Sequence, residues 1–358
     1  MNDTVEVLKR YSAAALEPKA GLCCPSAPEP ALLDLLPREI IDRDYGCGDL
    51  TRFIRPGDIV LDLGSGSGKG CYIAAQLTGP EGFVIGVDAN DEMLALARRY
   101  QGEMARKLGS DRVRFVKGLI QDLALDLEQL DLHLAECPVQ SAIDLVALED
   151  WKRQVRRKAP MIADASVDLV VSNCVMNLVA EADRPAFICE IARVLRPGGR
   201  VAIADIVSDK PVPDALKADT ELWSDCVSGA YLEGDLIRAF AEAGFHAIRI
   251  ESRTEKPWQI VDGISFRSVT ISAVRNDDGA CIYSDNAVIY RGPYAEVRDE
   301  DGHVFPRGEP VPVCEKTFTA LMAGPYGDDF FAASASGEVG GNVDVERSSA
   351  CGPGTSCC

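Results

Sequence analysis

The chain has 358 residues, and its 37 lysines and arginines against 56 aspartates and glutamates give a net charge of −19. A chain this acidic is a poor partner for nucleic acid or for an anionic membrane surface, so neither is expected. Hydrophobic residues make up 47%, which is ordinary for a globular protein and too much for a disordered one. No apolar run approaches the roughly 20 residues of a membrane span, and the first residues show no signal-peptide core. We therefore expect a soluble, cytoplasmic monomer.

The predicted elements follow a regular order. The first 55 residues predict an early helix, a turn-rich cysteine pair at Cys23 and Cys24, and a second helix at 31–41. Helices are then expected at 71–77, at 91–107 and in a segment ending at Arg196, which Pro197-Gly198-Gly199 stops. Short apolar runs between them predict buried strands at 59–63, 83–88, 113–118, 167–172 and 200–206. Alternating strands and helices predict an α/β fold with a doubly wound parallel sheet.

The remaining segments divide the chain. Strands are expected at 246–252 and 266–274, and the sequence then predicts a smaller β-rich C-terminal domain. The Ser- and Gly-rich tail is predicted to be disordered. Within the main domain, an insertion at about 124–163 contains an amphipathic helix at 143–158, for which a lid or a self-association surface is the simplest interpretation. The expected parts are a lead-in at 1–37, the main domain at 38–276, the C-terminal domain at 277–331 and the tail at 332–358.

A glycine-rich loop joins the first strand to the next helix. It is Asp62-Leu63-Gly64-Ser65-Gly66-Ser67-Gly68, and Asp88 ends the second strand 88 − 66 = 22 residues after the central glycine. Glycines let a ligand approach the backbone, and an acidic side chain at that spacing can bind a ribose diol. No Gly-Lys-Ser/Thr follows, which excludes a P-loop. The pattern suits S-adenosylmethionine (SAM), although Asp88 could instead cap the next helix while the glycines only turn the chain.

Residues 38–275 resemble the class I SAM-dependent methyltransferases, which implies their Rossmann-like fold. By this resemblance the cofactor contacts are Tyr45, Asp62, Gly64, Ser65, Gly66, Asp88, Ala89, Ile120, Gln121 and Asn173. Gln121 stands where an acidic residue is common in the more specific family named below. In that family Arg-Asp usually precedes the cysteine of the loop helix, whereas here Lys69-Gly70 precede Cys71.

Thirteen cysteines are the unusual feature of the composition. An odd number of cysteines in a leaderless chain makes a poor disulfide framework. The sequence also has no paired Cys-x-x-Cys motifs of the kind that bind zinc. Cys189, in a helical segment, fits a small buried hydrophobe. Cys174 is different, because it follows the fourth strand, where ligands bind in open α/β sheets. Cys226 lies 226 − 174 = 52 residues further on, where helical burial is an equal alternative, and Cys47 lies on a Gly-flanked turn. If two or three thiolates meet, they form a soft pocket poorly suited to an organic hydroxyl.

At these residues the sequence resembles the arsenite methyltransferases over nearly its whole length. The shared motifs are Tyr45-Gly46-Cys47-Gly48, the glycine loop, Ser172-Asn173-Cys174-Val175-Met176-Asn177-Leu178, the Leu222-Trp223 to Ala230 segment, and Ile289 to Pro293, Asp301 to Gly308 and Pro325 to Phe330 near the C-terminus. The resemblance implies that Cys174 and Cys226 bind As(III), with Cys47 as third thiolate and redox partner. One of Cys23 and Cys24 would exchange a disulfide with Cys47. SAM is then the methyl donor, arsenite and methylated As(III) are the substrates, and thioredoxin or glutathione is the reductant.

Two alternatives remain open at the level of sequence. A SAM methyltransferase of an organic acceptor, such as a sterol or quinone, would make Cys174 and Cys226 inert, so that serine in their place would spare activity. A non-catalytic, thiol-rich metalloid-binding protein would bind arsenic without any dependence on SAM. The intact glycine loop and Asp88 argue against this second alternative.

Overall fold

The computed structural model describes residues 4–17, 29–276 and 279–335. Cys23, Cys24 and residues 336–358 of the predicted tail lie outside the described residues. The boundary predicted between 331 and 332 is wrong, because residues 332–334 belong to a strand that begins at Phe330. The chain divides into two compact units, Met1–Ala243 with Ile248–Ala273, and Gly244–Ala247 with Val274–Cys358. Among the described helices, none combines the length and the apolarity that crossing a membrane requires.

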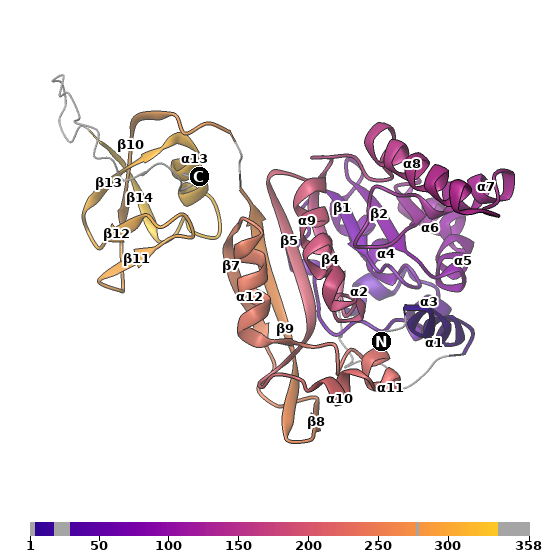
Figure 1. The fold of residues 1–358 in the computed structure, drawn as a ribbon. Coiled ribbons are helices and arrows are strands. Elements are labelled where there is room, and N and C mark those ends of the chain that lie inside the picture. The colour runs from indigo at the N-terminus through magenta and orange to yellow at the C-terminus, as the bar shows by residue number, and fades with distance from the viewer. Residues whose placement is uncertain (1–3, 18–28, 277–278, 336–358) are drawn as a thin grey trace. The chain divides into compact units, whose positions relative to one another are not determined.

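The first unit is built on a nine-stranded sheet. Its strand order is β3-β2-β1-β4-β5-β9-β7, with β6 beside β5 and β8 beside β9 (Figure 1). The strands β1 to β5 pair parallel with one another, as in doubly wound sheets. Both faces are covered, which explains the continuous apolar runs in the central strands. The strands are β1 (Ile59–Leu63), β2 (Phe83–Asp88), β3 (Val113–Lys117), β4 (Val167–Asn173), β5 (Leu195–Ser208), β6 (Tyr231–Leu232), β7 (Phe245–Arg253), β8 (Gln259–Val261) and β9 (Ile264–Arg275).

Helices lie on both faces of this sheet (Figure 1), and the predicted α/β class is confirmed. Each parallel strand ends at the same edge of the sheet, so the loops that follow β1, β2 and β4 meet there. The helices of the unit are α1 (Thr4–Leu16), α2 (Pro30–Leu33), α3 (Arg38–Asp42), η1 (Thr51–Phe53), α4 (Lys69–Thr78), α5 (Asp91–Arg99), α6 (Gln101–Leu108), α7 (Leu127–Glu136), α8 (Ala142–Lys158), η2 (Met176–Leu178), η3 (Glu181–Asp183), α9 (Arg184–Val194), α10 (Asp214–Lys217), α11 (Thr220–Ser224) and α12 (Glu233–Glu242).

Several predicted boundaries differ from the structure, and α9, for example, ends at Val194 where the sequence predicted Arg196. The single helix expected at 31–41 is two helices, because Pro37 has no N–H and restricts the residue before it. The helix expected at 91–107 breaks at Tyr100, whose hydroxyl donates to Glu39 Oε2 at 2.5 Å. The strand β5 begins at Leu195 instead of Arg200. Leu195 already pairs with β4, and the register then shifts before Arg200, so Pro197-Gly198-Gly199 lie within β5 at this shift.

Cys189 was expected to be buried, and this prediction is wrong. It lies on the exposed face of α9. The neighbouring residues Phe187, Ile188 and Ile191 take the positions that face the core.

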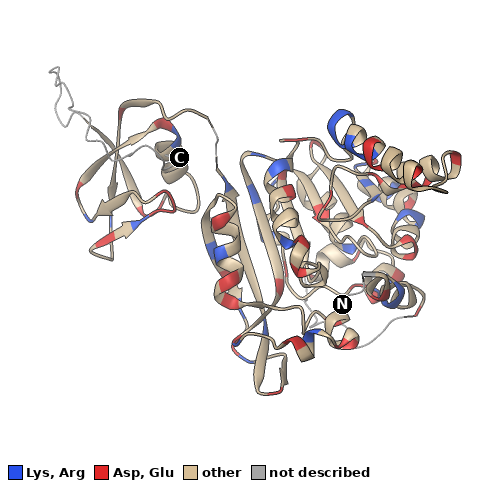
Figure 2. Ribbon diagram, in the orientation of Figure 1, with Lys and Arg blue, Asp and Glu red and all other residues tan. Residues whose placement is uncertain are grey.

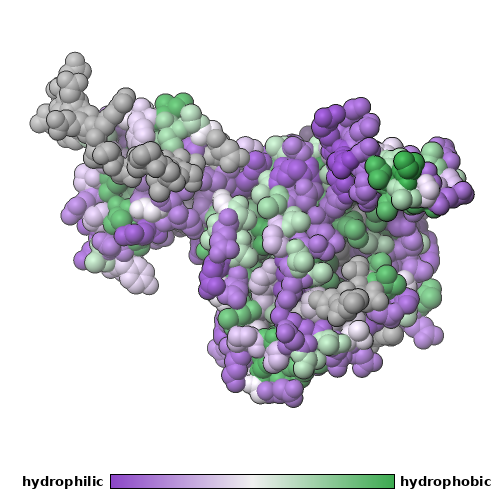
Figure 3. All heavy atoms as spheres, viewed as in Figure 1, coloured by the Kyte–Doolittle hydropathy of each residue, from purple (hydrophilic) through white to green (hydrophobic). Residues whose placement is uncertain are grey.

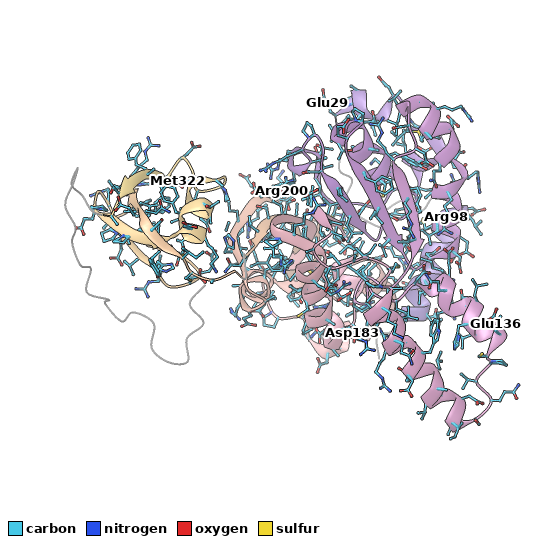
Figure 4. All side chains as sticks on the ribbon, turned by 90° about the horizontal axis from the view of Figure 1, so that it is seen from above. Glu29, Arg98, Glu136, Asp183, Arg200 and Met322 are labelled. Atoms are coloured by element: carbon cyan, nitrogen blue, oxygen red, sulfur yellow. A yellow bond between two sulfur atoms is a disulfide. The ribbon has the colours of Figure 1, made fainter. Side chains whose placement is uncertain are left out.

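The insertion after β3 is a helical hairpin of α7 and α8. Arg156 of α8 donates to both carboxylate oxygens of Asp122, and the ring of His133 stacks on Trp151 with centroids 4.1 Å apart. Figure 4, in which Glu136 is labelled at the end of α7, shows the hairpin extending from the body of the unit. Basic residues cluster at one end of α8 (Figure 2). Apolar residues cover part of the hairpin surface (Figure 3), namely Leu132, Ile143, Leu145 and Val146. The helix α7 was not predicted.

The second unit is smaller and rich in strands, as predicted. Strand β10 (Tyr283–Tyr290) pairs antiparallel with β13 (Pro310–Cys314) and with β14 (Phe330–Ser334). A separate pair is formed by β11 (Glu296–Arg298) and β12 (Val304–Pro306), and α13 (Glu315–Met322) is a helix that the sequence did not predict. The core of the second unit contains Val288, Tyr290, Phe305, Val313, Leu321 and Phe330.

Candidate cofactor and thiol site

A cavity opens at the carboxyl ends of β1, β2 and β4, where ligands bind in sheets of this topology. All ten residues predicted to contact the cofactor line it, namely Tyr45, Asp62, Gly64, Ser65, Gly66, Asp88, Ala89, Ile120, Gln121 and Asn173. Val7, Leu8 and Tyr11 of α1 also line it, and sequence reasoning missed them.

The glycine loop is held against the end of β2. The N–H groups of Gly64 and Ser65 donate to the carbonyl oxygen of Val87 at 2.8 and 3.0 Å. Gly64 has a φ of +73°, and a Cβ there would lie 2.4 Å from the side chain of Val175. A Cβ on Gly66 would meet no atom within 4 Å, so this part of the loop faces open space in the cavity. The loop therefore offers its backbone to a ligand.

Asp88 is fixed at the edge of the cavity. One of its carboxylate oxygens accepts from the N–H of Gly66 and the other from the N–H of Asn90, each at 2.8 Å. Burial raises the pKa of Asp88, and these hydrogen bonds oppose the shift. The capping of α5 falls to Asn90, whose side chain accepts from Met93 N at 3.0 Å. Asp88 does not cap that helix, and its carboxylate faces the ligand site.

Asp62 is the second acidic group of the cavity. Its carboxylate accepts a hydrogen bond from the Cys71 thiol, with Sγ 3.2 Å from Oδ2. Burial is the main cause that raises the pKa of Asp62 to about 7, and repulsion from Asp44 and Asp88 adds to it. A side chain at Gly70 would begin 2.8 Å from Asp62 Oδ2, so the glycine leaves room for this carboxylate.

Asn173 joins the end of β4 to the turn that carries Cys47. Its Oδ1 accepts from Cys47 N at 2.7 Å and from Gly48 N at 3.1 Å, while its Nδ2 donates to Gly48 O at 2.7 Å. The turn passes so close that a Cβ on Gly46 would lie 2.6 Å from Asn173 Nδ2. Tyr45 is held from the other side, where its hydroxyl donates to Ala14 O in α1. Asn173 thus borders the cavity and also positions the cysteine turn.

The three cysteines predicted to act together lie together. Cys47 and Cys174 form a disulfide with their Cα atoms 5.8 Å apart. The Cys226 thiol is buried and donates to the backbone oxygen of Cys174 at 3.1 Å. Cys174 and Cys226 also have left-handed backbones, with φ of 57° and 61°. Such a conformation costs a non-glycine residue on the order of 1–3 kcal/mol and is found mainly at functional sites. The predicted exchange between Cys47 and Cys23 or Cys24 lies outside the described residues.

The helix α1 covers the cavity and contacts the Cys226 segment. Asn90 Nδ2 donates to Leu8 O at 2.9 Å, which fixes α1 beside the end of β2. Arg10 forms an ion pair with Asp225, directly before Cys226, and Tyr11 Oη donates to Ser224 O. The helical pattern of these residues was visible in the sequence, but no local signal shows which surface such a helix covers.

The residues around the cavity fit SAM. The molecule carries a sulfonium and an ammonium group, and the carboxyl groups of Asp62 and Asp88 can supply the complementary charge, whereas Asp44 is paired with Lys69 at 2.7 Å. Ile120 and Met93 offer apolar surface on which a planar ring could lie, and the glycine loop leaves open space beside its backbone.

Comparison with known proteins agrees with this site. A methyltransferase domain matches residues 54–150 and 153–244, and a domain of unknown function (DUF8838) matches 277–355. The fold and the cavity define a SAM-dependent methyltransferase.

Relatives along the whole chain define the family. The chain is 32% identical to the arsenite methyltransferase of Aquipseudomonas alcaligenes, over 95% of this chain and 94% of that protein. It is 28% identical to the arsenite methyltransferase of Mus musculus, over 82% and 71%. The crystal structure of CrArsM, an arsenic (III) S-adenosylmethionine methyltransferase from Chlamydomonas reinhardtii, superposes with a TM-score of 0.56 at 26% identity, over 89% and 100%. The chain belongs to the arsenite methyltransferases.

Proposed function

We propose that this protein transfers methyl groups from SAM to trivalent arsenic bound by Cys174 and Cys226, with Cys47 as the third thiolate for inorganic arsenite. The observation that carries the proposal is the meeting of these cysteines beside the cofactor cavity. Cys47 and Cys174 are close enough to be bonded, and the Cys226 thiol is 3.1 Å from the backbone of Cys174. Soft thiolates are ligands suited to trivalent arsenic and poorly suited to an organic hydroxyl.

The cofactor residues divide by chemistry. When bound, SAM supplies a methyl group on a sulfonium sulfur. Asp88 would bind the ribose hydroxyls and Asp62 would face the positively charged amino-acid end, since both carboxyl groups line the cavity. Ile120 and Gln121 border the adenine. Contacts from the backbone come from Gly64, Ser65, Gly66 and Ala89, with Tyr45 and Asn173 closing the side nearest the cysteines.

The thiolates activate and position the arsenic atom, and no acid or base residue takes part in the transfer. Trivalent arsenic carries a lone pair, so the nucleophile has no proton to lose and needs no general base. Thiolate donation raises the electron density on arsenic, and two As–S bonds fix its position relative to the methyl group. With both groups bound, the lone pair would form the As–C bond as the C–S bond of the sulfonium broke, and the electrons of that bond would stay on sulfur.

A redox step completes the cycle. Methyl transfer leaves arsenic formally pentavalent, and two thiolates return it to the trivalent state by giving up two electrons and joining as a disulfide. The Cys47–Cys174 bond is such an oxidised pair. Cys23 or Cys24 would then attack Cys47, moving the disulfide and freeing Cys174. Thioredoxin or glutathione would reduce the protein, which suits the cytoplasm, and the role of the cycle would be arsenic detoxification.

The test is direct. Reduced protein is incubated with SAM, arsenite and a thiol, and methylated arsenic is measured. Cys174→Ser and Cys226→Ser should each abolish the product, because two thiolates are the minimum that holds a methylated As(III), while SAM affinity stays near normal. Cys189→Ser is the matched control, since this cysteine is exposed on α9. Robust turnover by Cys174→Ser would favour an organic acceptor, and arsenic binding without any methylated product would favour a sequestration protein.

A further inference from the structure

The two arsenic-binding cysteines lie on different segments that side chains hold together. Cys174 follows β4, and Cys226 follows α11. Asn177 links the two, because its Nδ2 donates to Asp205 Oδ1 and to Ile206 O at 2.7 Å each, and to the backbone oxygen of Cys226 at 3.3 Å. One side chain thus connects the segment after Cys174, the strand β5 and Cys226 itself.

Asp205 fixes the same segment to β5. It is 1% exposed, and its Oδ2 accepts from the N–H groups of Met176 and Asn177 at 2.9 and 3.3 Å. Its Oδ1 accepts from the N–H of Ile206 at 2.8 Å and from Asn177 Nδ2. All four partners are donors, so the position requires a group that only accepts, and an amide would turn its NH₂ group toward a donor.

Arg184 supplies a third link. Its guanidinium donates to Gly229 O at 2.6 Å and to Val179 O at 3.1 Å, and it lies over the ring of Tyr231 at 4.6 Å. Burial lowers the pKa of Arg184. The segments approach so closely here that a Cβ on Gly229 would lie 2.2 Å from Asn177 O. The side chain therefore spans from the segment after Cys174 to the segment after Cys226.

We propose that Asn177, Asp205 and Arg184 are positioning residues that set the separation of the Cys174 and Cys226 thiols before arsenic binds. The inference rests on the proposed function, in which these two cysteines are the arsenic ligands. None of the three residues lines the cofactor cavity. They act through the backbones of the cysteine segments and touch neither cofactor nor arsenic.

The physical reason is the cost of forming two As–S bonds from separate segments. If each cysteine moved independently, forming the second As–S bond would require one segment to become ordered. The entropy lost in that ordering would reduce the binding free energy for arsenic. Both cysteines also keep left-handed backbones, which persist only where the surroundings hold them. A buried charged network without a positioning role would stabilise the fold no better than packed apolar groups.

The test measures dithiol binding apart from activity. Phenylarsine oxide, a trivalent arsenical with two exchangeable positions, is titrated into reduced protein while the arsenic–thiolate absorbance in the ultraviolet is followed. Every protein in the series carries serine at Cys23, Cys24, Cys47, Cys357 and Cys358, so that neither the adjacent pairs nor the Cys47–Cys174 pair can bind the probe. Asn177→Ala should lower the affinity for phenylarsine oxide by about tenfold or more. SAM affinity, measured by calorimetry, should change by less than about threefold because the cavity is untouched. Arg184→Lys, which keeps the charge but shortens the reach to Gly229, should show a smaller loss and serves if Asn177→Ala does not fold.

A second buried network provides the matched control. Asp58 accepts from the guanidinium of Arg200 at 2.6 and 2.7 Å, before β1 and away from the cysteine segments (Figure 4 labels Arg200). Asp58→Asn should lower the melting temperature without lowering phenylarsine oxide affinity.

Two results would overturn the proposal. One is unchanged arsenical affinity in folded Asn177→Ala and Arg184→Lys. The other is an equal loss in Asp58→Asn, which would make the effect one of general stability. If Cys174→Ser binds phenylarsine oxide as well as the unsubstituted protein, the arsenic assignment itself fails, and the positioning proposal fails with it for that separate reason.

Discussion

Asp62 is a carboxyl group whose charge changes near neutral pH. Burial raises its pKa to about 7, and its hydrogen bond from Cys71 only partly offsets this. The pKa of Asp62 is higher in the folded state than in the unfolded state, so folding takes up a proton at intermediate pH. The contribution of Asp62 to the stability of the fold is therefore lost as pH rises from about pH 4 to about pH 7. The bound cation favours the ionised form, so the ligand and the proton compete.

The first prediction follows for cofactor binding. SAM affinity should increase as pH rises from about 6 to about 8, and binding near pH 7 should release protons, because the cation favours ionised Asp62. Asp88, whose pKa is also raised, contributes in the same direction. Calorimetry in buffers with different ionisation heats measures the protons released. Asp62→Asn should release fewer, and an unchanged release in that variant would assign the effect to another group.

The second prediction separates Cys47 from the other two cysteines. Arsenite offers three exchangeable positions and a methylated As(III) offers two, so Cys47→Ser should block the first methylation strongly and still convert methylarsenite. The same variant cannot form the Cys47–Cys174 disulfide. Product profiles for both substrates, measured side by side, check this, with Cys137→Ser as an exposed control. Equal loss on both substrates would make Cys47 a general requirement of the site.

At the scale of elements, strand and helix positions in the sheet were predictable, because each buried parallel strand is one short apolar run. The glycine loop and Asp88 could also be placed, because they stand at the ends of two of these strands. The meeting of the Cys47 turn, the end of β4 and the segment after α11 was different, since no local signal brings such distant residues together. Family resemblance supplied that grouping. The contacts of Asn173, the left-handed cysteines and the position of α1 depend on tertiary packing and could not be predicted.

The third prediction concerns α1 as a cover of the cofactor cavity. Arg10 and Tyr11 fasten it to the segment before Cys226, through Asp225 and Ser224. The double variant Arg10→Ala/Tyr11→Ala should speed SAM dissociation by about tenfold, since a loosened cover exposes the ligand to water. Stopped-flow displacement measures the rate. Lys9→Ala is the control on the same helix, as its ion pair with Glu6 is exposed and local, and an equal effect there would contradict the covering role.

At the scale of the whole molecule, the second unit ends in a strand that its core needs. Phe330 of β14 is 6% exposed and packs with Tyr290 and Phe305, and β14 pairs with β10 along five positions. Every residue assigned to cofactor or arsenic that the structure describes lies in the first unit. Among the residues that the structure describes, β14 is therefore the last element that the core of this unit requires.

The fourth prediction compares two truncations. Removing residues 336–358 should leave the melting temperature and methylation nearly unchanged, although three cysteines are lost with them. Removing residues 330–358 should destabilise the second unit, because β10 loses a partner and the core loses an aromatic ring at a cost of about 3–5 kcal/mol. Calorimetric melting of both truncated chains decides between the outcomes. Loss of activity in the shorter truncation would give the tail thiols a catalytic role.

The Cys47–Cys174 disulfide has a consequence for the direction of the catalytic cycle. Two of the three thiolates proposed to bind arsenic are withdrawn in one step when this bond forms, and Cys226 keeps its thiol. Arsenic is then left with a single anchor, which is too few to retain it against water and solution thiols. Oxidation would thus eject the product, and the empty oxidised site could not recapture it. The site would therefore stay closed to arsenic until thiol exchange moves this disulfide away from Cys174 and a reductant restores the thiols, which would give the cycle its direction.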